Sequence, residues 1–194
     1  MNIFNEICRR DTVDIRETVN DIELLSDQLL GLIESYIADE IIIVCIGTDR
    51  NVGDSLAPIV GTRLKNTSNC IIYGIIGDTV NALNVDDINK HIETNYPNAL
   101  VIAVDAGLGK EEDIGKVTVN FGAIHPSKGI GRDLLPIGDI SIVGIVGRDD
   151  IQNPLDLLHQ ASLYDIINMS DIIVEILKKA IYKWEVLNKI NTHF

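Results

Sequence analysis

Two aspartates, Asp54 and Asp105, stand where the sequence could support acid–base chemistry. Short apolar runs precede them, Ile41–Ile46 and Ala99–Val104, and both runs are typical of strands buried on both faces. Carboxyl ends of parallel strands meet at one edge of a sheet, so we expect the two side chains to lie close together. Two neighbouring carboxyl groups do not both ionise readily, so one keeps its proton and the pair offers a general acid and a general base. Hydrolysis of a peptide bond through an activated water can use such a pair.

The same residues also fit roles other than acid–base catalysis. The two aspartates could chelate a cation, and His125 could add a nitrogen ligand or orient a substrate carbonyl. Asp54 could instead cap the helix that follows it, and Asp105 could accept hydrogen bonds from loop amides. A single histidine in a loop is more often inert. The spacing of these residues leaves the alternatives open.

A third acid, Asp78, follows another apolar run, Cys70–Ile75, and should gather at the same edge of the sheet. If the Ile41–Ile46 strand lies between the other two strands, the strand order reverses beside it. A crevice then falls between the loops that carry Asp54 and Asp105.

Periodicity elsewhere predicts the elements that hold this edge in place. The first three elements are an amphipathic helix over Val13–Tyr36, a helix from Gly53 to near Leu64, and a short helix through Ile88 and Ile92 that ends at Tyr96 and Pro97. A strand over Lys116–Phe121, antiparallel or at an edge, a long loop over residues 122–138 and a strand over Asp139–Val146 follow. Helical periodicity then runs from Pro154 to about Leu187 and splits near Ser162–Asp165. The alternation of strands and helices predicts an α/β fold with a mostly parallel sheet and helices above and below it.

Length and charge restrict the classes of protein to which the chain can belong. It has 194 residues, 46% of them hydrophobic, so we expect a single domain over residues 1–194, with residues 1–12 as a candidate mobile tail. The net charge of −13 argues against direct nucleic-acid binding, which needs clustered Lys and Arg. No run approaches the roughly 20 apolar residues of a membrane span, and the first residues are too charged for a secretory signal. We expect a cytoplasmic protein.

Other chemistry-bearing residues give weaker indications. The cysteines are odd in number and far apart, which is typical of reduced thiols in the cytosol: Cys8, Cys45 and Cys70. The remaining histidines are expected at the surface: His91, His159 and His193. The sequence has neither the glycine-rich pattern of a nucleotide-binding loop nor the G-x-S-x-G pattern of serine hydrolases.

Three ordered segments of the sequence resemble motifs of the germination protease of spore-forming bacteria. They are Asn51–Pro58, Val101–Ala106 and Gly122–Gly131. The chain is still more similar to a shorter type of sporulation protein, the YyaC type. That type shares the pattern G-T-D-R-x-x-G-D-S-L from Gly47 onwards, the loop around Asp78, and the segment Leu135–Val146.

The resemblance implies a fold and a set of site residues. The fold is a three-layer α/β/α sandwich with a mostly parallel central sheet, shared with germination protease and the hydrogenase maturation endopeptidases. The catalytic pair of germination protease corresponds to Asp54 and Asp105. We expect substrate contacts at His125, Asp78, Gly47, Asp49 and Arg50, and we expect no cofactor and no resident metal.

The hydrogenase maturation endopeptidases differ from this sequence at one motif. Their corresponding acids, together with a histidine, bind the metal centre of the substrate. Asp54 and Asp105 match these acids by motif, whereas His125 matches only the histidine of the germination-protease loop. Gly53, Asp54 and Ser55 replace the usual D-[DE]-G pattern, which weakens a nickel-dependent interpretation.

Residues and resemblance together favour a sporulation-associated peptidase that acts in the cytoplasm of the sporulating cell. Its partners would be a protein or peptide substrate, small spore proteins among them, without nucleic acid or membrane. The apolar C-terminal helix is compatible with a homo-oligomer. Two alternatives stay open: a non-catalytic protein that binds a sporulation partner, and a metal-dependent maturation endopeptidase.

Overall fold

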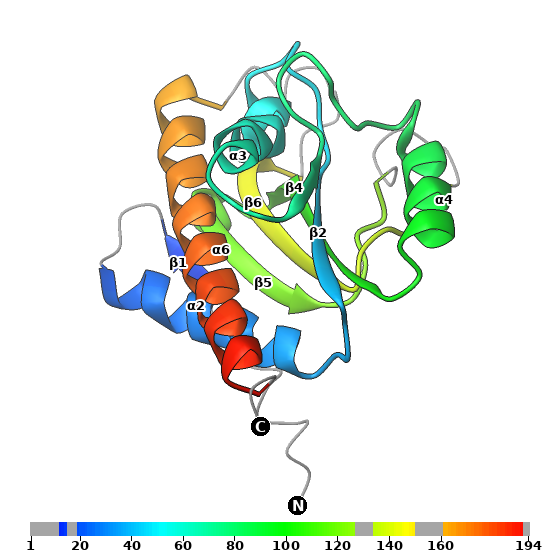
Figure 1. The fold of residues 1–194 in the computed structure, drawn as a ribbon. Helices are drawn as coiled ribbons and strands as arrows, with labels where there is room; N and C mark the ends of the chain where they lie inside the picture. The colour runs from blue at the N-terminus through cyan, green and yellow to red at the C-terminus, as the bar shows by residue number, and fades with distance from the viewer. Residues whose placement is uncertain (1–11, 15–18, 127–133, 150–160, 192–194) are drawn as a thin grey trace, which may run out of the picture.

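The middle layer of the protein is a single β-sheet (Figure 1). The computed structural model describes residues 12–14, 19–126, 134–149 and 161–191. In this part of the chain, six strands form the sheet in the order β1-β5-β6-β4-β2-β3. Their bounds are β1 Thr12–Asp14, β2 Glu40–Cys45, β3 Ile71–Tyr73, β4 Ala99–Gly109, β5 Lys116–Phe121 and β6 Ile140–Arg148.

Of the strands that the structure describes, only β5 runs against the others. β2 pairs in parallel with β3 and β4, and β4 pairs in parallel with β6. β5 is antiparallel to both β6 and β1. The mostly parallel sheet is therefore confirmed, and so is an antiparallel strand over Lys116–Phe121. β2 lies between β3 and β4, so the condition for a reversal of strand order beside it is met.

β2 shows why the apolar runs become central strands. Ile42 and Val44 pack on one face of the sheet, Ile43 and Cys45 on the other, and all four side chains are fully buried. The β-branched side chains of Ile42, Ile43 and Val44 fit a pleated surface that is covered on both sides.

Helices cover both faces of the sheet, as the three-layer prediction required. The described helices are α2 Val19–Glu34, α3 Leu56–Lys65, α4 Val85–Asn95 and α6 Leu163–Asn191, with short 3₁₀ turns η1 Gly53–Ser55 and η2 Glu111–Asp113. α2, α3 and α6 pack on one face, and α4 packs on the other (Figure 1).

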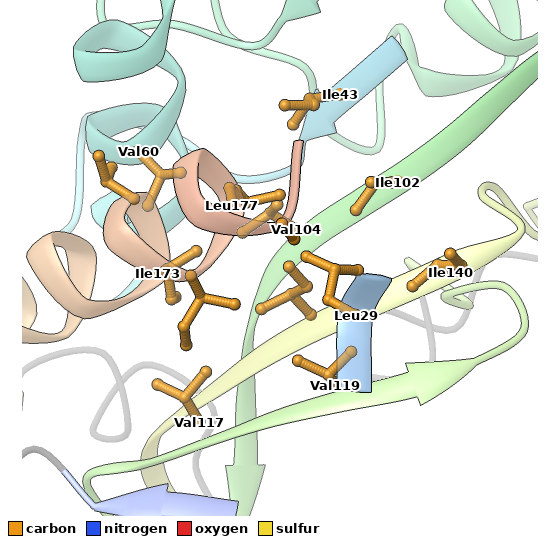
Figure 2. Close-up of a cluster of buried hydrophobic side chains, with 14 of the residues drawn as sticks. Leu29, Ile43, Val60, Ile102, Val104, Val117, Val119, Ile140, Ile173 and Leu177 are labelled. Atoms are coloured by element: carbon orange, nitrogen blue, oxygen red, sulfur yellow. The ribbon is translucent and has the colours of Figure 1, made fainter. Parts of the chain in front are cut away.

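The larger core lies between the sheet and the three helices of the first face. Figure 2 shows Leu29 of α2, Val60 of α3 and Ile173 of α6 converging on side chains from four strands. The smaller core, on the opposite face, joins Val85 and Ile92 of α4 to side chains of β2 and β4. Two separate cores fix the sheet from both sides.

Ion pairs at the surface fasten α2 to α6. Lys179 Nζ lies 2.8 Å from Glu23 Oε2, and Lys183 Nζ lies 2.7 Å from Asp27 Oδ1 and also contacts Glu23. Hydrogen bonds from Lys179 and then Lys183 lower the pKa of Glu23 to about 2. These pairs add to the apolar contacts between the two helices.

The N-terminal expectation was partly wrong. The helix predicted over Val13–Tyr36 begins at Val19, and Val13 belongs to strand β1, opposite Val117 of β5. β1 lies outside β5, so β5 is not an edge strand. Apart from Thr12, which starts β1, the tail expected over residues 1–12 falls outside the described residues.

Two strands are longer than predicted. β4 continues through Asp105 to Gly109, where a loop was expected, and β6 continues to Arg148. The described ends of the long loop are joined by a β-bridge between Ile124 and Ile137. Residues 127–133 of that loop and 150–160 of the expected C-terminal helix lie outside the described part of the chain.

Candidate functional site

The loop after β2 places Asp54 at the carboxyl edge of the sheet. The Thr48 N–H donates a hydrogen bond of 3.1 Å to the Asp54 carbonyl, which folds the loop back on itself. Gly47 makes this possible, because its φ is +151° and a Cβ there would lie 2.2 Å from the Asp54 carbonyl oxygen. Asp54 lies within η1 and does not cap α3: the N-cap position is Ser55, which makes no side-chain capping bond. The expectation of an Asp54 cap was wrong.

Asp105 lies inside β4, opposite Val143 of β6. The alternation of a strand places it on the same face as Val101 and Ala103, which belong to the core beneath α4. Its Oδ1 accepts a 2.8 Å hydrogen bond from the N–H of Ala106. The predicted bond from a backbone amide is therefore present, although it forms within a strand and not in a loop.

A glycine two residues after Asp105 permits close packing on that face. A Cβ at Gly107 would lie 2.6 Å from Cγ1 of Val143 and 3.2 Å from Cδ1 of Ile145. Val143 and Ile145 therefore pack directly against the backbone of β4 at Gly107. The glycine-rich segment that resembled a loop is thus a strand whose neighbours leave little room for a Cβ at Gly107 and Gly109.

The structure brings the two aspartates within electrostatic reach of each other. Burial raises the pKa of Asp105 to about 8, the Ala106 hydrogen bond opposes this rise, and the negative charge of Asp54 adds to it. Burial also raises the pKa of Asp54, and a hydrogen bond from the Thr48 backbone opposes that rise. Asp105 is therefore the member that holds a proton at neutral pH.

Asp49 and Arg50 lie in the loop after β2 and Asp78 lies in the turn after β3, at the same edge of the sheet. The exposed Asp49 accepts a 2.9 Å hydrogen bond from the Gly77 N–H, which joins the loop after β2 to the turn after β3. Arg50 is exposed, and its backbone N–H donates to Thr48 Oγ1. Asp78 is exposed, in a turn closed by two 3.0 Å backbone bonds with Ile75.

Backbone hydrogen bonds connect the end of β2 to the neighbouring segments at this edge. The Gly47 N–H donates to the Val80 carbonyl at 2.8 Å, and the Ile46 N–H donates to the Val104 carbonyl at 2.8 Å. Thr62 Oγ1 of α3 accepts the Ile76 N–H at 2.9 Å. Sequence reasoning missed the role of Thr62, because nothing in a helical threonine signals a partner 14 residues away.

His125 is exposed and, within the described residues, bonds to neither aspartate. Its neighbour Ile124 pairs with Ile137, which is buried against the α4 side of the sheet. No three His, Cys, Asp or Glu side chains of the described ranges gather closely enough to hold a metal ion. The alternative of a metal centre from Asp54, Asp105 and His125 is therefore not formed there.

The other described candidate residues are two cysteines and one histidine. Cys45 and Cys70 are free thiols with pKa values raised by burial, that of Cys70 to about 11, so both are mostly protonated. His91 is exposed on α4, as expected. The expectations for Cys8, His159 and His193 lie outside the described residues.

A shallow pocket of about 290 Å³ lies between the C-terminal end of α3 and α6. Its lining includes Ser68, Lys178, Tyr182 and Glu185. None of the residues predicted to do chemistry lines it. Separately, no helix in the part of the chain that the structure describes is long and apolar enough to cross a membrane.

Known proteins resemble this chain in sequence and in fold. The Bacillus subtilis protein YyaC is 37% identical over 137 residues, which are 70% of this chain and 66% of that protein, just under two thirds of its length. The crystal structure of the [NiFe] hydrogenase maturation protease HycI from Thermococcus kodakarensis superposes with a TM-score of 0.47 at 19% identity, over 77% of this chain and 98% of HycI. The family described as "Protein of unknown function (DUF1256)" matches residues 15–176, and the chain belongs to that family.

Proposed function

We propose that this protein is a peptidase whose catalytic groups are Asp54 and Asp105. The single observation that carries the proposal is the electrostatic interaction of these carboxyl groups, with the pKa of Asp105 raised to about 8. A carboxyl that keeps its proton at pH 7 beside one that is ionised supplies an acid and a base in the same site. The motif resemblance to germination protease supports the same pair.

In the proposed mechanism, the Asp54 carboxylate takes a proton from water while the water oxygen attacks the peptide carbonyl carbon. Asp105 donates its proton to the carbonyl oxygen, and a neutral gem-diol forms. Asp54 then passes its proton to the amide nitrogen, the C–N bond breaks, and one diol hydroxyl returns a proton to Asp105. Both carboxyl groups end in their starting protonation states.

The neighbouring residues divide into two roles in this proposal. Gly47 and Asp49 shape the loop, since the Gly47 N–H is bonded to Val80 and Asp49 holds the Gly77 amide. Arg50, Asp78 and His125 are exposed and contact the substrate. We propose protein or peptide substrates, small spore proteins among them, in the cytoplasm of the sporulating cell.

The test is to incubate the full-length protein with a protein extract from sporulating cells and to map new peptide termini by mass spectrometry. Asp54→Asn and Asp105→Asn should each lower the cleavage rate by at least roughly 10²-fold, because each removes a proton-transfer group. Asp39→Asn, before β2 at the opposite edge of the sheet, is the matched control and should cleave normally.

The pH dependence of cleavage is a second readout of the same proposal. Activity should fall as the pH rises through about 8, because Asp105 then loses the proton that it donates. The peptidase proposal is wrong if the folded native protein and the two variants give the same peptide termini at every pH tested. A protein that binds a sporulation partner would then be the better account.

A further inference from the structure

Large apolar side chains are exposed in the loops at the edge of the sheet that carries the acid pair, and beside the start of α4. They are Val52, Ile76, Leu83, Leu108 and Leu135. Leu83 is 80% exposed and Ile76 is 50% exposed. Burial of large apolar side chains of this type normally stabilises a fold. All five lie in or next to the loops that follow β2, β3 and β4, or in the segment that leads into β6. We call these five residues the apolar rim.

Hydrogen bonds place two rim residues beside the Asp54 loop. Val52 immediately precedes η1, and its carbonyl accepts a 2.6 Å bond from Ser55 Oγ. The Ile76 N–H is bonded to Thr62 of α3, and the next amide, that of Gly77, is bonded to Asp49. Ile76 is therefore held between α3 and the loop that positions Asp54.

Leu83 is exposed on a turn that has its own hydrogen bonds. The Leu83 N–H donates to Asn81 Oδ1 at 3.0 Å, and Asn84 bonds both to the Asn81 N–H and to the Thr79 carbonyl. The Leu135 N–H donates to Asp86 Oδ1 at the start of α4. A hydrogen-bonded turn thus exposes Leu83 to solvent close to the start of α4. Exposed apolar groups on an ordered backbone are typical of binding surfaces.

The same loops carry an excess of negative charge. Residues 47–55 and 74–87 are all described, and their only cation is Arg50. Their carboxylates are Asp49, Asp54, Asp78, Asp86 and Asp87. This imbalance attracts Lys and Arg side chains and repels Asp and Glu.

We infer that the site recognises an extended peptide segment that has large apolar residues beside the scissile bond, Lys or Arg close by, and no neighbouring carboxylates. The apolar side chains of the segment cover the rim, and its cations face the carboxylates of the two loops. The inference rests on the proposed peptidase function and adds a substrate class to it.

Binding is measured separately from cleavage by fluorescence polarisation with the full-length Asp105→Asn variant. Four labelled peptides of equal length combine an apolar or a serine-rich centre with basic or acidic flanks. The apolar, basic peptide should bind roughly tenfold or more tightly than each of the others, and its affinity should fall with added salt. Equal affinity for all four peptides would overturn the inference.

Variants test whether the rim itself makes the contact. Leu83→Ser and Ile76→Ser, made in the Asp105→Asn background, should each weaken the apolar, basic peptide several-fold, whereas Ile37→Ser should not. Ile37 is fully exposed and precedes β2 at the opposite edge of the sheet. Asp78→Asn should weaken binding and reduce its salt dependence, and Glu34→Gln, exposed at the end of α2, is the matched control. Rim variants that behave like Ile37→Ser would contradict the inference.

Incubation of the same peptides with the native protein separates the two proposals. Cleavage that depends on the aspartates but shows no preference among the peptides would overturn the substrate class and leave the peptidase proposal standing. Binding that depends on the rim, with no cleavage, would support the recognition surface and contradict the peptidase proposal.

Discussion

Asp105 is an acid that the protein keeps protonated at neutral pH. Its carboxyl lies on a strand face next to apolar side chains, accepts one amide hydrogen bond and experiences the charge of Asp54. One hydrogen bond does not offset the loss of water, so the neutral form is favoured. A buried carboxyl group with a raised pKa lowers the stability of the folded protein at high pH. Shifted pKa values of this kind are common at functional sites.

The free energy of unfolding should depend on pH because Asp105 is protonated in the folded state. In the unfolded chain the Asp105 carboxyl ionises above its ordinary pKa of 3.8, whereas in the folded protein it keeps its proton up to about 8. Between these values the folded state binds the extra proton. The free energy of unfolding therefore falls with rising pH, by at most about 1.4 kcal/mol per pH unit from this group.

Asp105→Asn carries no such titration and should gain stability relative to the native protein as the pH rises between about 4 and 8. Urea unfolding at several pH values measures the difference. Asp78→Asn, an exposed change at the same sheet edge, controls for the loss of one negative charge. A constant difference between the native protein and Asp105→Asn would show that Asp105 is ionised at neutral pH.

At the scale of elements, the acid pair depends on how closely η1 approaches the end of β2. Gly47 allows that approach because it has no Cβ and adopts a positive φ. The loop is further held by the Asp49–Gly77 bond, so β2, β3 and α3 all contribute to the position of Asp54. Several elements together, and not one sequence motif, determine where Asp54 lies.

Gly47→Ala should therefore destabilise the protein by about 1–3 kcal/mol, through strain at this φ and a clash with the Asp54 carbonyl. It should also lower peptide cleavage more than stability alone explains, because Asp54 must move. Gly31→Ala is the matched control: nothing lies within 4 Å of the added Cβ in the last turn of α2, so it should stabilise by about 0.5–1 kcal/mol. Chemical denaturation and the cleavage assay measure both effects. Normal stability of Gly47→Ala would mean that the loop has another conformation in solution.

At the scale of the whole molecule, the parallel arrangement of the central strands could be predicted, whereas the full strand order and several boundaries could not. Buried apolar runs identified β2 and β4, and the topology of parallel strands predicted that Asp54 and Asp105 share an edge. β1 was missed because three residues have no local periodicity, and their partners, such as Thr118 for Thr12, are distant in sequence. The glycines that follow Asp105 looked like a loop because only packing against Val143 and Ile145 explains them.

The proximity of Asp54 and Asp105 was predictable, and their catalytic role stays a prediction. The bonds that hold its loops, such as Asp49 to Gly77 and Thr62 to Ile76, join segments 28 and 14 residues apart. Bonds of this kind depend on the final packing of α3 against the turn after β3, which no local pattern encodes. The raised pKa of Asp105 has the same origin, since it arises from burial on a face of the folded sheet.

The large core should control the stability of the whole fold. Ile173 of α6 is fully buried against the sheet (Figure 2), so Ile173→Ala should cost about 2–5 kcal/mol. Ile167→Ala, on the same helix but 37% exposed, should cost clearly less, about 1 kcal/mol or below. Thermal and urea unfolding compare the two variants. Equal losses would contradict the packing of α6 described above.

The two acids belong to parts of the molecule that should differ in how readily they open. Asp105 lies in β4, which is flanked by β2 and β6, so its segment should resist amide exchange nearly as long as the whole fold does. Asp54 lies in a single 3₁₀ turn after a loop, a type of structure that exchanges through small local openings. In the proposed mechanism the proton donor therefore stays in place, whereas the base can be withdrawn and restored without unfolding the sheet. A partner that ordered this one turn would slow amide exchange around Asp54 and complete the proposed acid pair.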